Sequence, residues 1–119
     1  LGWRVFAYTF PFTSNPGSYS SEDIKEYRAA WARTGDGSSM IAWYRAAAQV
    51  RVQRLPSPRI TVPTLVIWGK KDIALEAEMA QLSIDLCDDG RLVYIEDATH
   101  WVQVDAADQV NTLIGDFFK

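Results

Sequence analysis

The chain has 119 residues, of which 48% are hydrophobic and 23% are charged, so it is neither a disordered nor a collagen-like sequence. Acidic residues exceed basic ones by 15 to 12, and the resulting net charge of −3 argues against nucleic acid as a partner. One histidine and one cysteine cannot build a zinc site, and no apolar run approaches the roughly 18 residues of a membrane span. The lone Cys87 and the absence of a leader-like start favour a cytoplasmic protein.

The first half of the chain predicts helices joined by loops. Residues 8–20 hold two prolines and a glycine and predict a loop. Ser20 is a typical helix N-cap, and acidic residues follow it in the first turn. Three large side chains then share one helical face: Ile24, Tyr27 and Trp31. A second helix begins near Ser38, and its apolar residues on two sides indicate that other parts of the protein cover it.

The second half predicts alternating strands and helices. Residues 55–59 contain two prolines and form a stiff linker. Residues 62–68 and 92–95 are apolar at consecutive positions, which is typical of parallel strands covered on both faces. Residues 76–86 predict the helix between them, and Asp105 is a candidate N-cap for a last helix. The fold class is therefore α/β, with a parallel β-α-β-α unit.

Two strands alone make a marginal sheet. We therefore expect further strands from elsewhere, or a second copy of the chain paired with this one. The sequence is best interpreted as the C-terminal part of a larger α/β domain.

Two loops hold the candidate catalytic residues. Asp72 follows the first predicted strand closely, and His100 follows the second. Ligands of open α/β sheets bind at the carboxyl ends of the strands, so both side chains face the same crevice if the strands are neighbours. A carboxylate that holds one imidazole nitrogen leaves the other free to act as a base. Taken singly, each residue has an ordinary alternative: a surface histidine, and an aspartate in a turn or helix cap.

Three segments together resemble the α/β-hydrolase superfamily, in its epoxide hydrolase-like branch, which also includes haloalkane dehalogenases and related esterases. They are the Trp-Tyr-Arg-Ala run at residues 43–46, the strand and acid loop at residues 61–72, and the Asp-Ala-Thr-His-Trp run at residues 97–101. The resemblance implies that residues 1–58 are part of a helical cap. Residues 59–119 would then be the C-terminal part of the hydrolase core.

The resemblance also implies roles for individual residues. Asp72 would be the acid and His100 the base of a catalytic triad. Tyr44 matches a cap tyrosine that donates a hydrogen bond to an epoxide oxygen; its alternative is aromatic packing between cap and core. Trp101 would line the substrate pocket, or else pack in the core. Small departures from the family pattern are Ala42, where asparagine is usual, and Ala107, where proline is common.

The large departure from the family pattern is the missing nucleophile. No Gly-x-Ser/Asp-x-Gly elbow occurs in the sequence, and the Gly-Asp-Gly run at residues 35–37 follows no predicted strand. Cys87 is no substitute, because it lies at the end of a predicted helix, directly before two acidic residues. We therefore expect this chain to be a fragment or truncated form, inactive without the half that bears the nucleophile.

The sequence is compatible with two functions. In the first, the complete enzyme hydrolyses a small apolar epoxide, haloalkane or ester, with no metal and no cofactor. In the second, the chain is a non-catalytic remnant or an assembly module that dimerises through its sheet edge.

Overall fold

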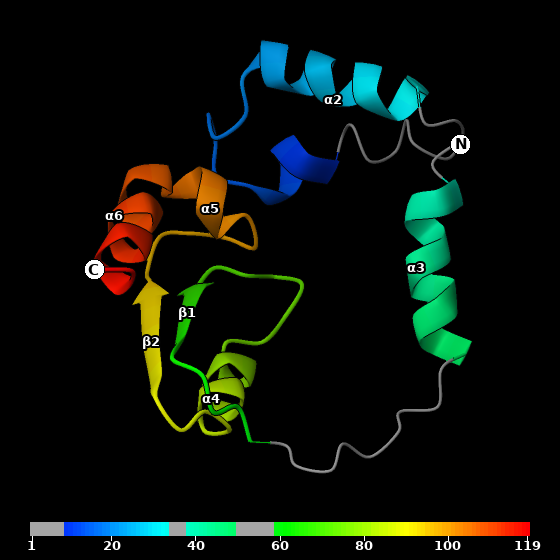
Figure 1. The fold of residues 1–119 in the computed structure, drawn as a ribbon. Helices are drawn as coiled ribbons and strands as arrows, with labels where there is room; N and C mark the ends of the chain where they lie inside the picture. Colours follow the sequence, from blue (N-terminus) through cyan, green and yellow to red (C-terminus); the bar gives the residue numbers. More distant parts are fainter. Residues whose placement is uncertain (1–8, 34–37, 50–58) are drawn as a thin grey trace.

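The computed structural model describes residues 9–33, 38–49 and 59–119, whose arrangement is shown in Figure 1. The elements follow in chain order as helices α2 (Ser21–Arg33) and α3 (Ser38–Gln49), strand β1 (Thr64–Gly69), helix α4 (Glu78–Ile84), strand β2 (Gly90–Ile95), and helices α5 (Val102–Asp105) and α6 (Ala107–Phe117). This is the predicted β-α-β-α unit, preceded by helical segments.

The two strands pair in parallel, as their apolar sequences predict. Thr64 lies opposite Gly90 at the start of the ladder, and Gly69 lies opposite Ile95 at its end. The loops that follow the two strands therefore leave the sheet at the same edge. Figure 1 shows both strands pointing towards the segment that carries α5. This shared edge is what brings the acid loop and the histidine loop together.

The core of the described residues lies between the sheet and the last two helices. Ile95, Ala98 and Val110 are 7%, 1% and 6% exposed, and partly buried apolar side chains pack against them: Ile67, Val102 and Ala106. Larger apolar side chains elsewhere stay exposed, including Val62, Leu82 and Phe118. Exposed apolar surfaces of this kind usually lie against other protein.

The segment of residues 9–19 differs in part from its predicted loop. Residues 9–13 are helical, and the Thr13 hydroxyl donates to the Thr9 carbonyl at 2.7 Å. A turn follows, closed by a hydrogen bond of 3.1 Å from the Ser18 amide to the Asn15 carbonyl. Gly17 has a φ of 87°, a backbone conformation that favours glycine over any residue with a side chain. We call residues 9–19 the strap.

Helix α2 begins as the sequence predicts. The Ser20 hydroxyl accepts a hydrogen bond from the Asp23 amide at 3.1 Å, and the Asp23 carboxylate accepts one from the Ser20 amide at 2.7 Å. This reciprocal capping box satisfies two backbone donors at the helix start. Trp31 is 7% exposed, so the predicted face of α2 is buried at this residue.

Two predictions made from local patterns are wrong. Asp105 is not the N-cap of the last helix, because it ends α5 and Ala106 precedes α6 without a side-chain cap. Helix α3 begins at Ser38 as expected, but its residues 42–49 are all exposed, so the described part of the chain does not cover them. The Gly-Asp-Gly run and nearly all of the predicted linker lie outside the described residues.

The boundary between cap and core, expected after residue 58, stays a prediction.

In the described ranges, no helix combines the length and the apolarity needed to cross a membrane.

Candidate active site

The carboxylate of Asp72 is held from two sides. The amides of Ala74 and Leu75 donate to Oδ1 at 2.8 and 3.0 Å, and His100 Nδ1 lies 2.9 Å from Oδ2. The Asp72 side chain is 7% exposed. The contact expected between the acid and the imidazole is therefore present, and the turn that follows Asp72 fixes the direction of the carboxylate.

The hydrogen bonds decide the protonation of this pair. Burial alone would raise the pKa of Asp72, but the bonds from His100 and from the Leu75 and Ala74 amides outweigh it, so the pKa lies below its ordinary value. An ionised carboxylate only accepts hydrogen bonds, so Nδ1 of His100 carries the proton. In the neutral ring Nε2 is then unprotonated and is the nitrogen that can act as a base.

The two loops are joined by their backbones as well as by the catalytic pair. The Lys70 amide donates to the Ile95 carbonyl at 3.0 Å, and the Lys71 amide donates to the Ala98 carbonyl at 2.9 Å. A Cβ atom on Gly69 would overlap the carbonyl oxygens of Ala98 and Thr99. Only a glycine lets the end of β1 approach the histidine loop this closely.

A mainly apolar cavity of about 500 Å³ lies beside the pair. Its lining residues come from the strap, from α3 and from both loops: Thr9, Phe10, Thr13, Tyr44, Ile73, Ala74, His100 and Trp101. The structure thus brings three of the four residues singled out in the sequence to one cavity wall. The fourth, Asp72, lies behind His100 and immediately precedes Ile73. A cavity of this size suits a small molecule.

Trp101 contacts both the cavity and an aromatic side chain of the strap, and its role towards a substrate stays a prediction. It lines the cavity, and its ring packs edge-on against Phe10 with centroids 4.4 Å apart. Its indole Nε1 donates to the Thr13 hydroxyl at 2.8 Å. The His100 ring lies edge-on to it at 5.4 Å. Tyr44, by contrast, is 73% exposed.

An aromatic cluster joins α2 to the histidine loop, and its central residue, Phe10, was not predicted from the sequence. The centroid of the Phe10 ring lies 5.4 Å from that of Trp31 and 5.3 Å from that of Tyr27, and Phe10 also contacts Trp101. Tyr19 also belongs to the cluster. Burial, together with the nearby charges, raises the pKa of Tyr19 to about 12, so its phenol stays neutral. In the strap, the sequence pattern consists of prolines and a glycine. These residues predict turns, but they do not predict which distant side chains the strap contacts.

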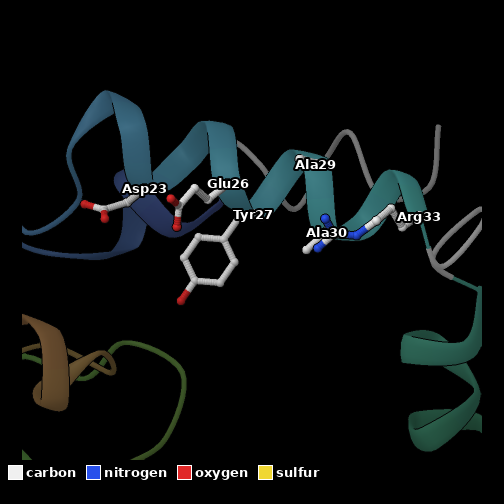
Figure 2. A pocket seen from close by; sticks show the side chains of 6 residues that line it. All are labelled: Asp23, Glu26, Tyr27, Ala29, Ala30 and Arg33. Atoms are coloured by element: carbon white, nitrogen blue, oxygen red, sulfur yellow. The ribbon is translucent and has the colours of Figure 1, made fainter.

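A second hollow of about 520 Å³ runs along α2 and is shown in Figure 2. Six side chains of that one helix line it: Asp23, Glu26, Tyr27, Ala29, Ala30 and Arg33. None of the residues expected to do chemistry lies there. Within the described ranges, moreover, no group of three or more histidine, cysteine, aspartate or glutamate side chains gathers as metal ligands.

Comparisons with known proteins show which proteins the chain is similar to. No model of a protein family matches the chain. The AB hydrolase superfamily protein YfhM of Bacillus subtilis is 33% identical over 107 residues, which cover 90% of this chain and 37% of that protein. Human epoxide hydrolase 4 is 35% identical over 101 residues, which cover 84% of this chain and 27% of that protein. The chain thus spans from about a quarter to just over a third of these relatives.

Comparison with solved structures identifies the fold. An epoxide hydrolase from Bacillus megaterium superposes with a TM-score of 0.73 over 86% of this chain and 38% of its own, at 20% identity. The fold is therefore the α/β-hydrolase fold, of which the chain supplies a C-terminal part. In sequence the chain is similar to an AB hydrolase superfamily protein and to epoxide hydrolases.

Proposed function

We propose that this chain carries the acid and the base of a hydrolase triad, with Asp72 orienting His100 and His100 activating water. The observation that supports this most strongly is the 2.9 Å contact between His100 Nδ1 and Asp72 Oδ2 at the wall of an apolar cavity. If His100 were only a surface histidine, it would not need a nearly buried carboxylate as its partner. If Asp72 were only a turn residue, it would not need an imidazole as its partner.

The reaction proceeds in two steps. A nucleophile outside this sequence attacks an electrophilic carbon, and the bond from that carbon to its leaving oxygen or halide breaks. The substrate is then held as an ester on the enzyme. His100 Nε2 next removes a proton from a water molecule, whose oxygen attacks the acyl carbon of that ester. The ester bond breaks, the product leaves with the proton, and the nucleophile is restored.

The substrate class follows from the cavity and the nucleophile. A mainly apolar wall favours a small apolar molecule. With an aspartate nucleophile the substrate is an epoxide or a haloalkane; with a serine it is an ester, and His100 also deprotonates the serine. Tyr44 favours the epoxide, because a phenol at the cavity can stabilise the alkoxide that forms when the ring opens. The names of the relatives point the same way.

The proposal has consequences for the chain itself. Residues 1–58 contribute to a cap over the cavity, and the complete active site needs a nucleophile elbow that this sequence does not contain. Cys87 is buried and free, which is compatible with the reducing cytoplasm where we expect the protein.

Turnover by the product of the gene's complete reading frame is the test. We expect it to convert an apolar epoxide such as styrene oxide to its diol, and the 119-residue chain alone to convert none. A single turnover with excess enzyme in ¹⁸O-labelled water identifies the nucleophile. An aspartate gives a first diol without label, because its new oxygen comes from the protein. Absence of diol together with rapid release of p-nitrophenol from an ester would replace the epoxide by an ester as substrate.

A second candidate is an assembly module, and it has its own supporting observation. The described residues form a sheet of only two strands, with large apolar side chains such as Val62 exposed beside it. Edges of this kind can pair with a second copy. Sedimentation of the purified chain would then show a dimer, and a monomer would eliminate this candidate.

A further inference from the structure

The Asp105 carboxylate lies at the junction of the strap and the histidine loop. Its Oδ1 accepts hydrogen bonds from the Asn15 amide at 3.0 Å and the Ser18 hydroxyl at 2.5 Å. Its Oδ2 accepts bonds from the amide and the hydroxyl of Thr99 at 2.8 and 2.5 Å. One side chain thus ties together two segments that are about 90 positions apart in sequence.

Thr99 transmits this restraint to the catalytic base. It immediately precedes His100, it is 9% exposed, and its hydroxyl also accepts a bond from the Trp101 amide at 3.2 Å. The backbone on both sides of His100 is therefore fixed through one threonine. The other end of the restraint is the strap, which supplies part of the cavity wall.

Four hydrogen-bond donors face the Asp105 carboxylate, so replacing it by a side chain that also carries donors would leave some of them without an acceptor. Each carboxylate oxygen faces two donors, and an asparagine would place an amide NH₂ against one of these pairs. Burial opposes ionisation of Asp105, but the hydrogen bonds from Ser18, Thr99 and Asn15 hold its pKa below the ordinary value, so the carboxylate is present at neutral pH. If Asp105 were only a helix cap, it would not need its hydrogen bonds to Asn15 and Ser18 of the strap.

We propose that Asp105 is a positioning residue for the catalytic base: by binding Thr99 and the strap together, it holds His100 against Asp72 and closes the cavity wall over it. This inference rests on the proposed function, since positioning matters only if His100 is the base. It assigns to Asp105 a role that the sequence alone did not suggest.

The test uses the single histidine of the chain, which gives one imidazole Nδ1–H resonance in an ¹⁵N-labelled sample. We expect this proton to be protected from exchange with water in the wild-type chain. In Asp105→Asn its exchange should be about tenfold faster, as for the loss of one ordinary hydrogen bond. The matched control is Asp108→Asn, which removes the same charge from an exposed site in the first turn of α6. It should leave the exchange rate unchanged.

Further variants separate positioning from general stability. Thr99→Val should reproduce the effect of Asp105→Asn, because it removes the hydroxyl link to the histidine loop. Ser18→Ala removes one of the two strap contacts of Asp105 and leaves the Asn15 contact, so it should speed exchange of the His100 proton less than Asp105→Asn does.

Two results would overturn the assignment. One is an unchanged His100 proton in Asp105→Asn. The other is an equal loss of protection at the amides of β1 and β2, since Asp105 would then support the whole fold. The readout needs no substrate, so a failure to find hydrolysis would refute the proposed function and leave this result standing.

Discussion

Replacing Gly69 by alanine should separate the two catalytic loops. The added Cβ would overlap two backbone carbonyl oxygens, those of Ala98 and Thr99. Backbone atoms cannot rotate away as the end of a flexible side chain can, so the histidine loop must move as a unit. That movement acts directly on His100, the residue after Thr99.

The size of the effect can be estimated from the contacts at stake. Inserting a methyl group into a packed site costs about 1–3 kcal/mol. Separating the loops also weakens the bond from the Lys71 amide to the Ala98 carbonyl, worth about 1 kcal/mol. We therefore expect Gly69→Ala to lower the free energy of unfolding by about 2–4 kcal/mol.

Urea unfolding followed by tryptophan fluorescence measures this change. The control is Gly115→Ala in α6, where an added Cβ meets no atom within 4 Å. Alanine in a helix interior is favoured over glycine by up to about 1 kcal/mol, so the control should be slightly stabilised. If Gly69→Ala unfolds at the same urea concentration as the wild type, the end of β1 and the histidine loop are not in close contact.

Three further predictions concern catalysis, pH and folding. In the gene's complete product, Asp72→Asn should lower kcat by about 10⁴-fold, as expected when the imidazole loses its orienting carboxylate; a loss of less than tenfold in steady-state assays would argue against a triad. The folded-state pKa of Asp72 and that of Asp105 are both lowered. Their contribution to stability is therefore complete above the unfolded value of about 3.9, and it is lost as the pH falls through the lower folded values. Urea unfolding at pH values below about 3.9 should show this loss of stability. Asp72→Asn should reduce the loss, and an identical pH dependence of stability in the variant would contradict the prediction. Ser20→Ala should cost about 1 kcal/mol through loss of the capping box of α2, and circular dichroism during urea unfolding would detect it. No change on that substitution would mean that α2 depends on its aromatic contacts alone.

The sequence predicted the parts of the site that depend on chain order. Two apolar runs, each followed by a polar loop, were enough to indicate parallel strands with Asp72 and His100 at one edge. Because the carboxyl ends of two adjacent parallel strands lie at the same edge of the sheet, the loops that follow them must lie close together. The contact between the two side chains follows from that topology.

The parts that the sequence missed depend on side chains far apart in the chain. Asp105 has the local pattern of a helix cap, and nothing near it in sequence indicates Asn15 or Ser18 as partners. The two apolar lines of α3 predict a covered helix, yet Trp43 and Tyr44 are 76% and 73% exposed, because hydrophobic periodicity states which faces are apolar and not what lies against them.

Mass spectrometry of the intact protein tests the central claim most directly, that His100 activates the water of the second step. The gene's complete product and its His100→Ala variant are exposed to an apolar epoxide and weighed before and after. With an aspartate nucleophile, the variant should gain the mass of one epoxide and keep it, while the wild type returns to its own mass. A variant that returns as quickly as the wild type would show that His100 is not the base.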